Sequence, residues 1–68
     1  MIIKFSKNFY NLKAIKTGIL AYKHLAKFDI KERKDSIEII IKNIDKNFKN
    51  VICDEFCNYI LAEMKNAY

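Results

Sequence analysis

The spacing of apolar residues switches between two periods along this chain of 68 residues, and the order of those periods constrains the fold more than any other feature. An apolar residue at every second position is typical of a half-buried strand, whereas spacings of three and four are typical of a helix with one buried face. Segments 2–6, 28–33 and 37–44 follow the first pattern, and segments 12–26 and 51–67 follow the second. The sequence therefore predicts the element order β-α-β-β-α.

Each predicted helix has a continuous apolar stripe and a candidate capping residue before it. Asn11 and Asn50 stand where a side chain can accept a hydrogen bond from a free N–H of the first turn. Gly18 lowers the helix propensity of the first segment, so we expect it to mark a close approach to the sheet. The stripes are Leu12, Ile15, Ile19, Tyr22 and Ala26 in the first helix, and Cys53, Phe56, Cys57, Ile60, Met64 and Ala67 in the second.

These elements predict an α+β fold in one small domain spanning residues 1–68. The polar turn at residues 34–36 joins the last two strands into a hairpin. Two helices on one face of a three-stranded sheet form a two-layer sandwich, in which the first two strands run parallel if they share the sheet. The other sheet face is then open and mostly charged. By alternation Phe28 and Ile30 point inward, and the open face carries Ile2, Lys4, Asp29, Lys31, Arg33, Glu38, Ile40 and Lys42.

Composition argues against several classes of protein. No apolar run approaches the roughly 18 residues of a membrane span. The first residues do not resemble a secretory signal, so we expect a cytoplasmic protein. The chain has no Gly-rich phosphate loop, no zinc-protease motif and no carboxylate pair with a companion base. We therefore expect no enzyme activity and no cofactor.

Cys53, Cys57 and His24 are the residues with the most reactive or metal-binding side chains. A structural zinc site needs four ligands, and His24 is the only imidazole. Both cysteines lie on an apolar stripe, where a thiol commonly serves as a small buried side chain. We therefore predict structural cysteines, a solvated histidine at a helix end, and no catalytic or metal-binding residue.

The net charge of +5 is concentrated in the first half of the chain. Residues 1–34 hold nine basic and two acidic side chains, whereas residues 35–68 hold four basic and six acidic ones. Helical periodicity places four lysines on one arc of the first helix, with Leu20 among them. This arc is either a solvated face or a track for phosphates, so a basic nucleic-acid-binding regulator is an alternative function. The four are Lys13, Lys16, Lys23 and Lys27.

Two segments resemble small HxsD-like proteins of the His-Xaa-Ser system. Residues 3–15, IKFSKNFYNLKAI, are similar to the family's strand and Tyr-x-Leu-x-Ala-Ile/Val helix entry. Residues 54–61, DEFCNYIL, are similar to its Gly-Glu-Phe-x-Asn-x-x-Leu helix, with Glu55, Phe56 and Asn58 as the distinctive cluster and Asp54 in place of the Gly. The resemblance implies an accessory role beside radical-SAM enzymes that modify precursor peptides, and it carries no catalytic residues.

We therefore expect a non-catalytic adaptor that binds a precursor peptide, a radical-SAM enzyme, or both. An extended peptide can add to a sheet edge, and segments 28–33 and 37–43 are the candidate edges. A core this small commonly needs association to be stable, so we also expect a homodimer or an obligate partner, and a self-associating structural module is a further alternative. Nucleic-acid binding should be weak and nonspecific. The candidate partner-binding residues are Lys16, Leu20, Lys23, Lys31, Arg33 and Ile40.

Overall fold

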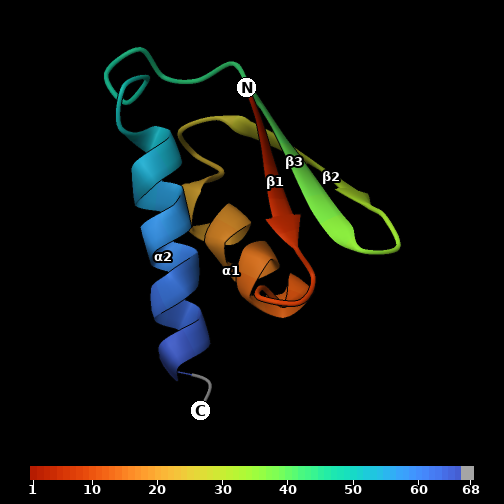
Figure 1. Ribbon diagram of the computed structural model, residues 1–68. Coiled ribbons are helices and arrows are strands. Elements are labelled where there is room, and N and C mark those ends of the chain that lie inside the picture. The colour runs from red at the N-terminus through yellow and green to blue at the C-terminus, as the bar shows by residue number, and fades with distance from the viewer. Residues whose placement is uncertain (67–68) are drawn as a thin grey trace.

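The computed structural model describes residues 1–66 and contains the predicted order of elements (Figure 1). The α+β class and the β-α-β-β-α order are confirmed. Ala67, the last residue of the predicted second stripe, lies outside the described residues. The elements are β1 (Ile2–Ser6), α1 (Leu12–Tyr22), β2 (Lys27–Glu32), β3 (Ser36–Lys42) and α2 (Ile52–Asn66).

The three strands form one sheet in the order β1-β3-β2. Both outer strands pair antiparallel with β3, so β1 and β2 run parallel to each other, as expected, with β3 between them. The predicted hairpin is present, and its turn is closed by the Arg33 N–H, which donates to the Ser36 carbonyl at 2.8 Å. The expectation that segment 37–43 forms a sheet edge is wrong, because β3 is hydrogen-bonded on both sides.

Both helices cover the same face of the sheet, with α1 between the sheet and α2 in the view of Figure 1. The odd-numbered isoleucines of β3 point into this layer, and Ile37, Ile39 and Ile41 are each at most 1% exposed. Alternation explains this arrangement, because successive side chains of a strand point to opposite faces. The remaining buried apolar side chains are Phe5, Ala14, Ile15, Ala26, Ile52, Phe56 and Ile60.

Helix α1 begins as predicted and ends earlier than predicted. Asn11 has extended backbone angles, and its Oδ1 accepts a hydrogen bond from the Ala14 N–H at 2.7 Å, which confirms the cap. The helix ends at Tyr22, about one turn before Ala26. The chain turns there because β2 pairs from Lys27 onward, and the carbonyl of Leu25 accepts the N–H of Asp45 at 2.7 Å.

Gly18 marks a close approach, but to α2 rather than to the sheet. A Cβ built on Gly18 would lie 2.9 Å from Ile60 Cγ1 and 3.2 Å from Phe56 Cε1. Both side chains are completely buried, so neither can move aside into solvent. The glycine therefore allows the two helices to pack closely, at the expense of helix propensity.

Helix α2 differs from prediction at its first turn. Asn50 is exposed and makes no capping hydrogen bond. The chain enters the helix through a tight turn, in which the carbonyl of Phe48 accepts the Ile52 N–H at 2.8 Å. The buried stripe is Ile52, Phe56 and Ile60, and Cys53 and Cys57 are only partly buried. Helical spacing places Ile52 on the stripe as readily as Cys53, and packing decides between them.

Replacing Gly18 with Ala tests the close helix contact. Ala should raise helix propensity by up to about 1 kcal/mol, but overpacking of a filled core typically costs about 1–3 kcal/mol. We expect Gly18→Ala to lower the free energy of unfolding by about 1–2 kcal/mol in urea titrations. In an Ile60→Ala background, which removes the nearest atom, the same change should be neutral or stabilising. An equal loss in both backgrounds would contradict this packing.

Candidate binding surface at the edge of the sheet

The sheet face opposite the helices is charged, as predicted, with Ile2 and Ile40 as a neighbouring apolar pair. Ile2 is 65% exposed, and Ile40 opposite it is partly buried. Beside them, Lys4, Glu38 and Lys31 form a row across all three strands. The sign of the charge therefore alternates across this row, and each neighbouring pair of strands has an opposite-charge cross-strand pair.

Arg33 strengthens the charged row at the hairpin end. Its Nε lies 2.9 Å from Glu38 Oε2, and this hydrogen bond is the main reason that the pKa of Glu38 is lowered, with the charges of Arg33, Lys4 and Lys31 adding to it. Glu38 thus remains ionised at neutral pH. A surface depression at this end of the sheet has three cations and one acid on its walls. It is lined by Lys4, Ser6, Arg33, Lys34, Asp35 and Ser36.

The outer edge of β2 has unpaired backbone groups. Because the Arg33 N–H bonds to Ser36, hydrogen-bonded pairs along the hairpin alternate from that position. The backbone groups of Phe28, Ile30 and Glu32 consequently point away from β3. No turn or loop within residues 1–66 supplies them with a backbone partner. This edge therefore has free donors and acceptors at three alternate positions, which is the template to which another strand can pair.

Two exposed apolar side chains, Ile30 and Leu20, lie along the β2 edge. Ile30 points to the helix side of the sheet, opposite the buried Ile39, yet it is 37% exposed. Helix α1 runs antiparallel to β2 (Figure 1). Lys16 is close enough to Glu32 to contribute to its lowered pKa, although a 2.8 Å bond from Lys7 is the larger cause. Leu20 follows Lys16 by one helical turn and is 64% exposed, so it lies on the same side of α1 as Lys16.

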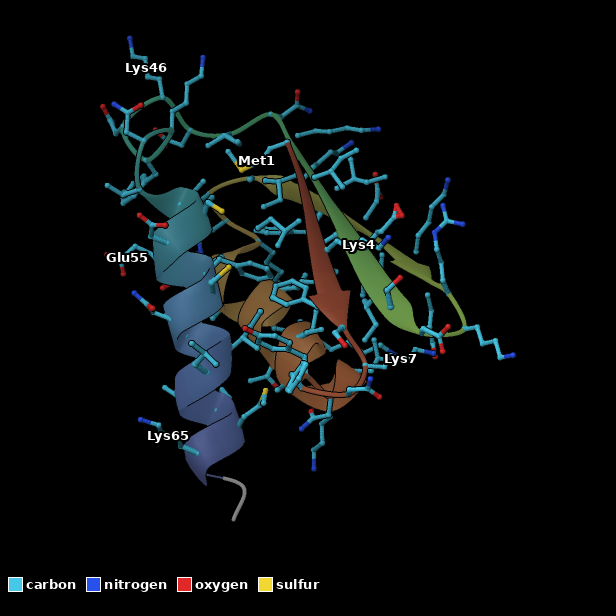
Figure 2. The ribbon with its side chains drawn as sticks, in the orientation of Figure 1. Met1, Lys4, Lys7, Lys46, Glu55 and Lys65 are labelled. Carbon is cyan, nitrogen blue, oxygen red and sulfur yellow. The ribbon has the colours of Figure 1, made fainter. Side chains whose placement is uncertain are left out.

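The opposite edge, at β1, is less suited to strand addition. Its hydrogen bonds to β3 use odd-numbered residues, as shown by the Ile41 N–H donating to the Met1 carbonyl at 2.8 Å. That leaves Ile2, Lys4 and Ser6 facing outward, and the Ser6 carbonyl already accepts the N–H groups of Phe9 and Tyr10. Lys4 lies at the middle of this strand (Figure 2). A short edge with a lysine at its centre resists pairing.

The structure divides the predicted lysine arc. Lys13 and Lys16 lie on α1, Lys23 follows the end of the helix, and Lys27 is the first residue of β2. The prediction of four lysines on one helical arc is wrong, because α1 ends before the fourth. The charge of Lys16 also helps to lower the pKa of Glu32. The remaining lysines therefore do not form one continuous helical track for a nucleic-acid backbone.

The cysteines, the histidine and the family-like cluster occupy different surroundings. No group of three His, Cys, Asp or Glu side chains within residues 1–66 is placed to hold a metal ion. His24 is exposed in the turn after α1, beside a shallow hollow that also involves Lys23 and Asp45. Glu55 and Asn58 are exposed on α2 (Figure 2), whereas Phe56 is fully buried. The family-like cluster therefore does not form one surface.

Sequence reasoning did not identify the exposed position of Ile30. Alternation placed it inward with Phe28, and it does point to the helix side. The helices leave the β2 edge uncovered, however, and apolar spacing contains no information about that.

Comparison with known proteins adds no assignment, since no family model, no curated protein and no solved structure matches the chain. None of the helices within residues 1–66 combines the length and the apolar character that crossing a bilayer requires.

The Cys57 thiol provides a test of the packing beneath α2. Burial, together with neighbouring Cys53 and Asp54, raises the pKa of Cys57 to about 11. Only the thiolate reacts with iodoacetamide, so labelling of Cys57 in the native protein should rise with a midpoint near that pH. In urea-unfolded chain the midpoint should return to about 8.5. Peptide mass spectrometry distinguishes the two cysteines.

The same shift predicts how stability depends on pH. Between these two pKa values the unfolded thiol is ionised while the folded one keeps its proton, so stability falls as pH rises through that range. A native labelling midpoint near that of the unfolded chain would show that Cys57 does not pack as described.

Proposed function

We propose that this protein is a non-catalytic adaptor that binds an extended segment of a partner along the free edge of β2. The observation that carries the proposal is the set of outward-facing backbone groups at Phe28, Ile30 and Glu32, with the exposed side chain of Ile30 among them. Main-chain hydrogen bonds provide affinity in strand addition, and side chains at alternate positions provide specificity.

The two sides of the β2 edge favour different side chains in the bound segment. On the helix side, Ile30 and Leu20 offer apolar contacts. On the other side, Lys31 makes no ion pair within 4 Å among the described residues, whereas Asp29 on the same face already pairs with Lys42 at 3.6 Å. The basic depression lies at the hairpin end of this face. A bound strand that alternates apolar and acidic residues complements both sides. Electrostatic complementarity of this kind selects among partners more than it raises affinity.

The resemblance to HxsD-like proteins suggests which partner meets this description. Segments 3–15 and 54–61 are similar to that family, whose members accompany radical-SAM enzymes and short precursor peptides. We therefore propose an acidic precursor peptide as the bound segment, and its modifying enzyme as the protein to which the adaptor delivers it. Glu55 and Asn58 are exposed on α2, and Glu55 points away from the sheet (Figure 2), which leaves a separate surface for such an enzyme.

A peptide of about eight residues that alternates Val and Glu tests the proposal, because its length matches an ordinary strand. Fluorescence anisotropy should detect binding to the protein, and binding should be weaker for a matched Val–Lys peptide. Ile30→Pro should abolish binding. The Ile30 N–H points away from β3 at the free edge of the sheet. Proline at this position therefore removes a donor for the bound peptide without removing a hydrogen bond to β3.

Lys4→Pro is the matched control, because its N–H points outward from the other edge. This variant should bind the Val–Glu peptide as the unmodified protein does. Circular dichroism confirms that both proline variants keep the sheet. Equal binding of the two peptides, or undiminished binding by Ile30→Pro, would contradict the proposal.

A further inference from the structure

Strand β2 has a charge pattern that is complementary to itself when read in the opposite direction. On the sheet face opposite the helices, β2 carries Lys27, Asp29 and Lys31. On the helix side, it carries Phe28, Ile30 and Glu32. Asp29 and Lys31 flank Ile30 symmetrically. An antiparallel copy of the same strand therefore brings each of these charges opposite its counter-charge.

Hydrogen bonding and the pleat restrict the ways in which two copies of this edge can pair. The residues with outward-facing backbone groups are the even-numbered ones, so these must pair with each other. A slip of one residue would also exchange the two faces of the strand. The symmetric registers are therefore centred on Phe28, Asp29, Ile30, Lys31 or Glu32.

Charge distinguishes these registers. Centring on Asp29, Lys31 or Glu32 places two identical charges opposite each other, which is destabilising. Centring on Phe28 pairs Lys27 with Asp29 but leaves the second half of the strand unpaired. Centring on Ile30 pairs the whole strand.

The register centred on Ile30 also forms two attractive cross-strand pairs. Asp29 and Lys31 lie opposite each other in the non-hydrogen-bonded positions, where side chains approach most closely. The like charges of Lys27 and Arg33 meet only at the two ends, where Arg33 is already bound to Glu38 at 2.9 Å.

We infer that two copies of this chain pair through their β2 strands in the register centred on Ile30, forming a continuous six-stranded sheet. The occupant of the edge is thus a second copy, selected by the two Asp29–Lys31 pairs. The two-fold axis passes through the Ile30 pair, so both helical layers lie on the same face. The exposed Ile30 of each copy then lies opposite the other at the axis, so this apolar side chain gains an apolar neighbour.

Self-pairing uses the same backbone groups as the proposed peptide, so the dimer masks the peptide-binding edge. That regulatory consequence rests on the proposed function, whereas the dimer itself does not. An interface of one strand pair is small, and interfaces of this size are typically weak. The dimer should therefore dissociate readily when a partner strand competes.

Charge reversal tests the register. Sedimentation of the unmodified protein should show a concentration-dependent monomer–dimer equilibrium. Asp29→Lys and Lys31→Asp should each weaken dimerisation on the order of tenfold or more, because each turns both attractive pairs into repulsive ones. The double variant Asp29→Lys/Lys31→Asp recreates both pairs with the charges exchanged, so it should recover the dimer.

Contacts with β3 in the same chain cannot imitate this recovery. Asp29 lies 3.6 Å from Lys42, and Lys31 lies opposite Glu38, so each substitution creates a like-charge contact within its own chain, and the double variant contains both. Lys46→Asp, in the exposed loop before α2, matches the net-charge change of Lys31→Asp and should leave the dimer unchanged.

Two results would overturn the inference: a monomer at all concentrations up to ~1 mM, the weak end of specific binding, or a double variant no more dimeric than the single ones. Neither result involves a peptide, so the inference and the proposed function can fail separately.

Discussion

The ring of Phe56 is the contact on which the rest of this fold depends. It is completely buried, and its centroid lies 5.1 Å from that of Phe28, 6.2 Å from Tyr22 and 6.3 Å from Phe5. One side chain of α2 thus touches β2, α1 and β1. Aromatic pairs add to the energy of area burial. Here the edge-to-face pairs with Tyr22 and Phe5 and the tilted pair with Phe28 join α2 to α1 and to both edge strands.

Gly18 makes this contact possible. The missing side chain lets α2 approach α1 closely enough for Ile60 and Phe56 to fill the space. The consequence is a core concentrated between the helices and one face of the sheet. A chain of this size has few apolar side chains to distribute. The other sheet face is therefore held by ion pairs and by the Ile2–Ile40 contact, and the strand edges remain uncovered.

The sequence was sufficient to predict the elements and their faces, because period and burial are directly related. The alternation of Ile37, Ile39 and Ile41 predicted the buried face of β3, and Asn11 predicted the start of α1. Strand order could not be predicted in this way. Alternation is the same for a central and an edge strand, so nothing local indicated that β3 lies between the other two.

The residues whose positions were predicted wrongly have another cause in common, which is that tertiary packing decides their surroundings. Lys27 follows the helical spacing of α1, yet pairing with Lys42 makes it part of β2. Gly18 signalled a close contact without indicating its partner. Ile30 was expected in the core, and its exposure depends on how far the helices extend over the sheet. In each case the local sequence pattern was present as described, but it does not indicate which part of the fold packs against the residue.

Both edges of this sheet have unpaired backbone groups, but the residues that surround these groups differ between the two edges. Unpaired strand edges invite association, and natural proteins commonly protect them with charges or cover them. At β1 a central lysine and the Ser6 turn protect the edge. At β2 the charges alternate in sign about Ile30, so they disfavour three of the five symmetric registers, and of the other two only the register centred on Ile30 pairs the whole strand. Charges that restrict the register of pairing do not prevent association. They make it specific, and this distinguishes a binding edge from one that is only protected.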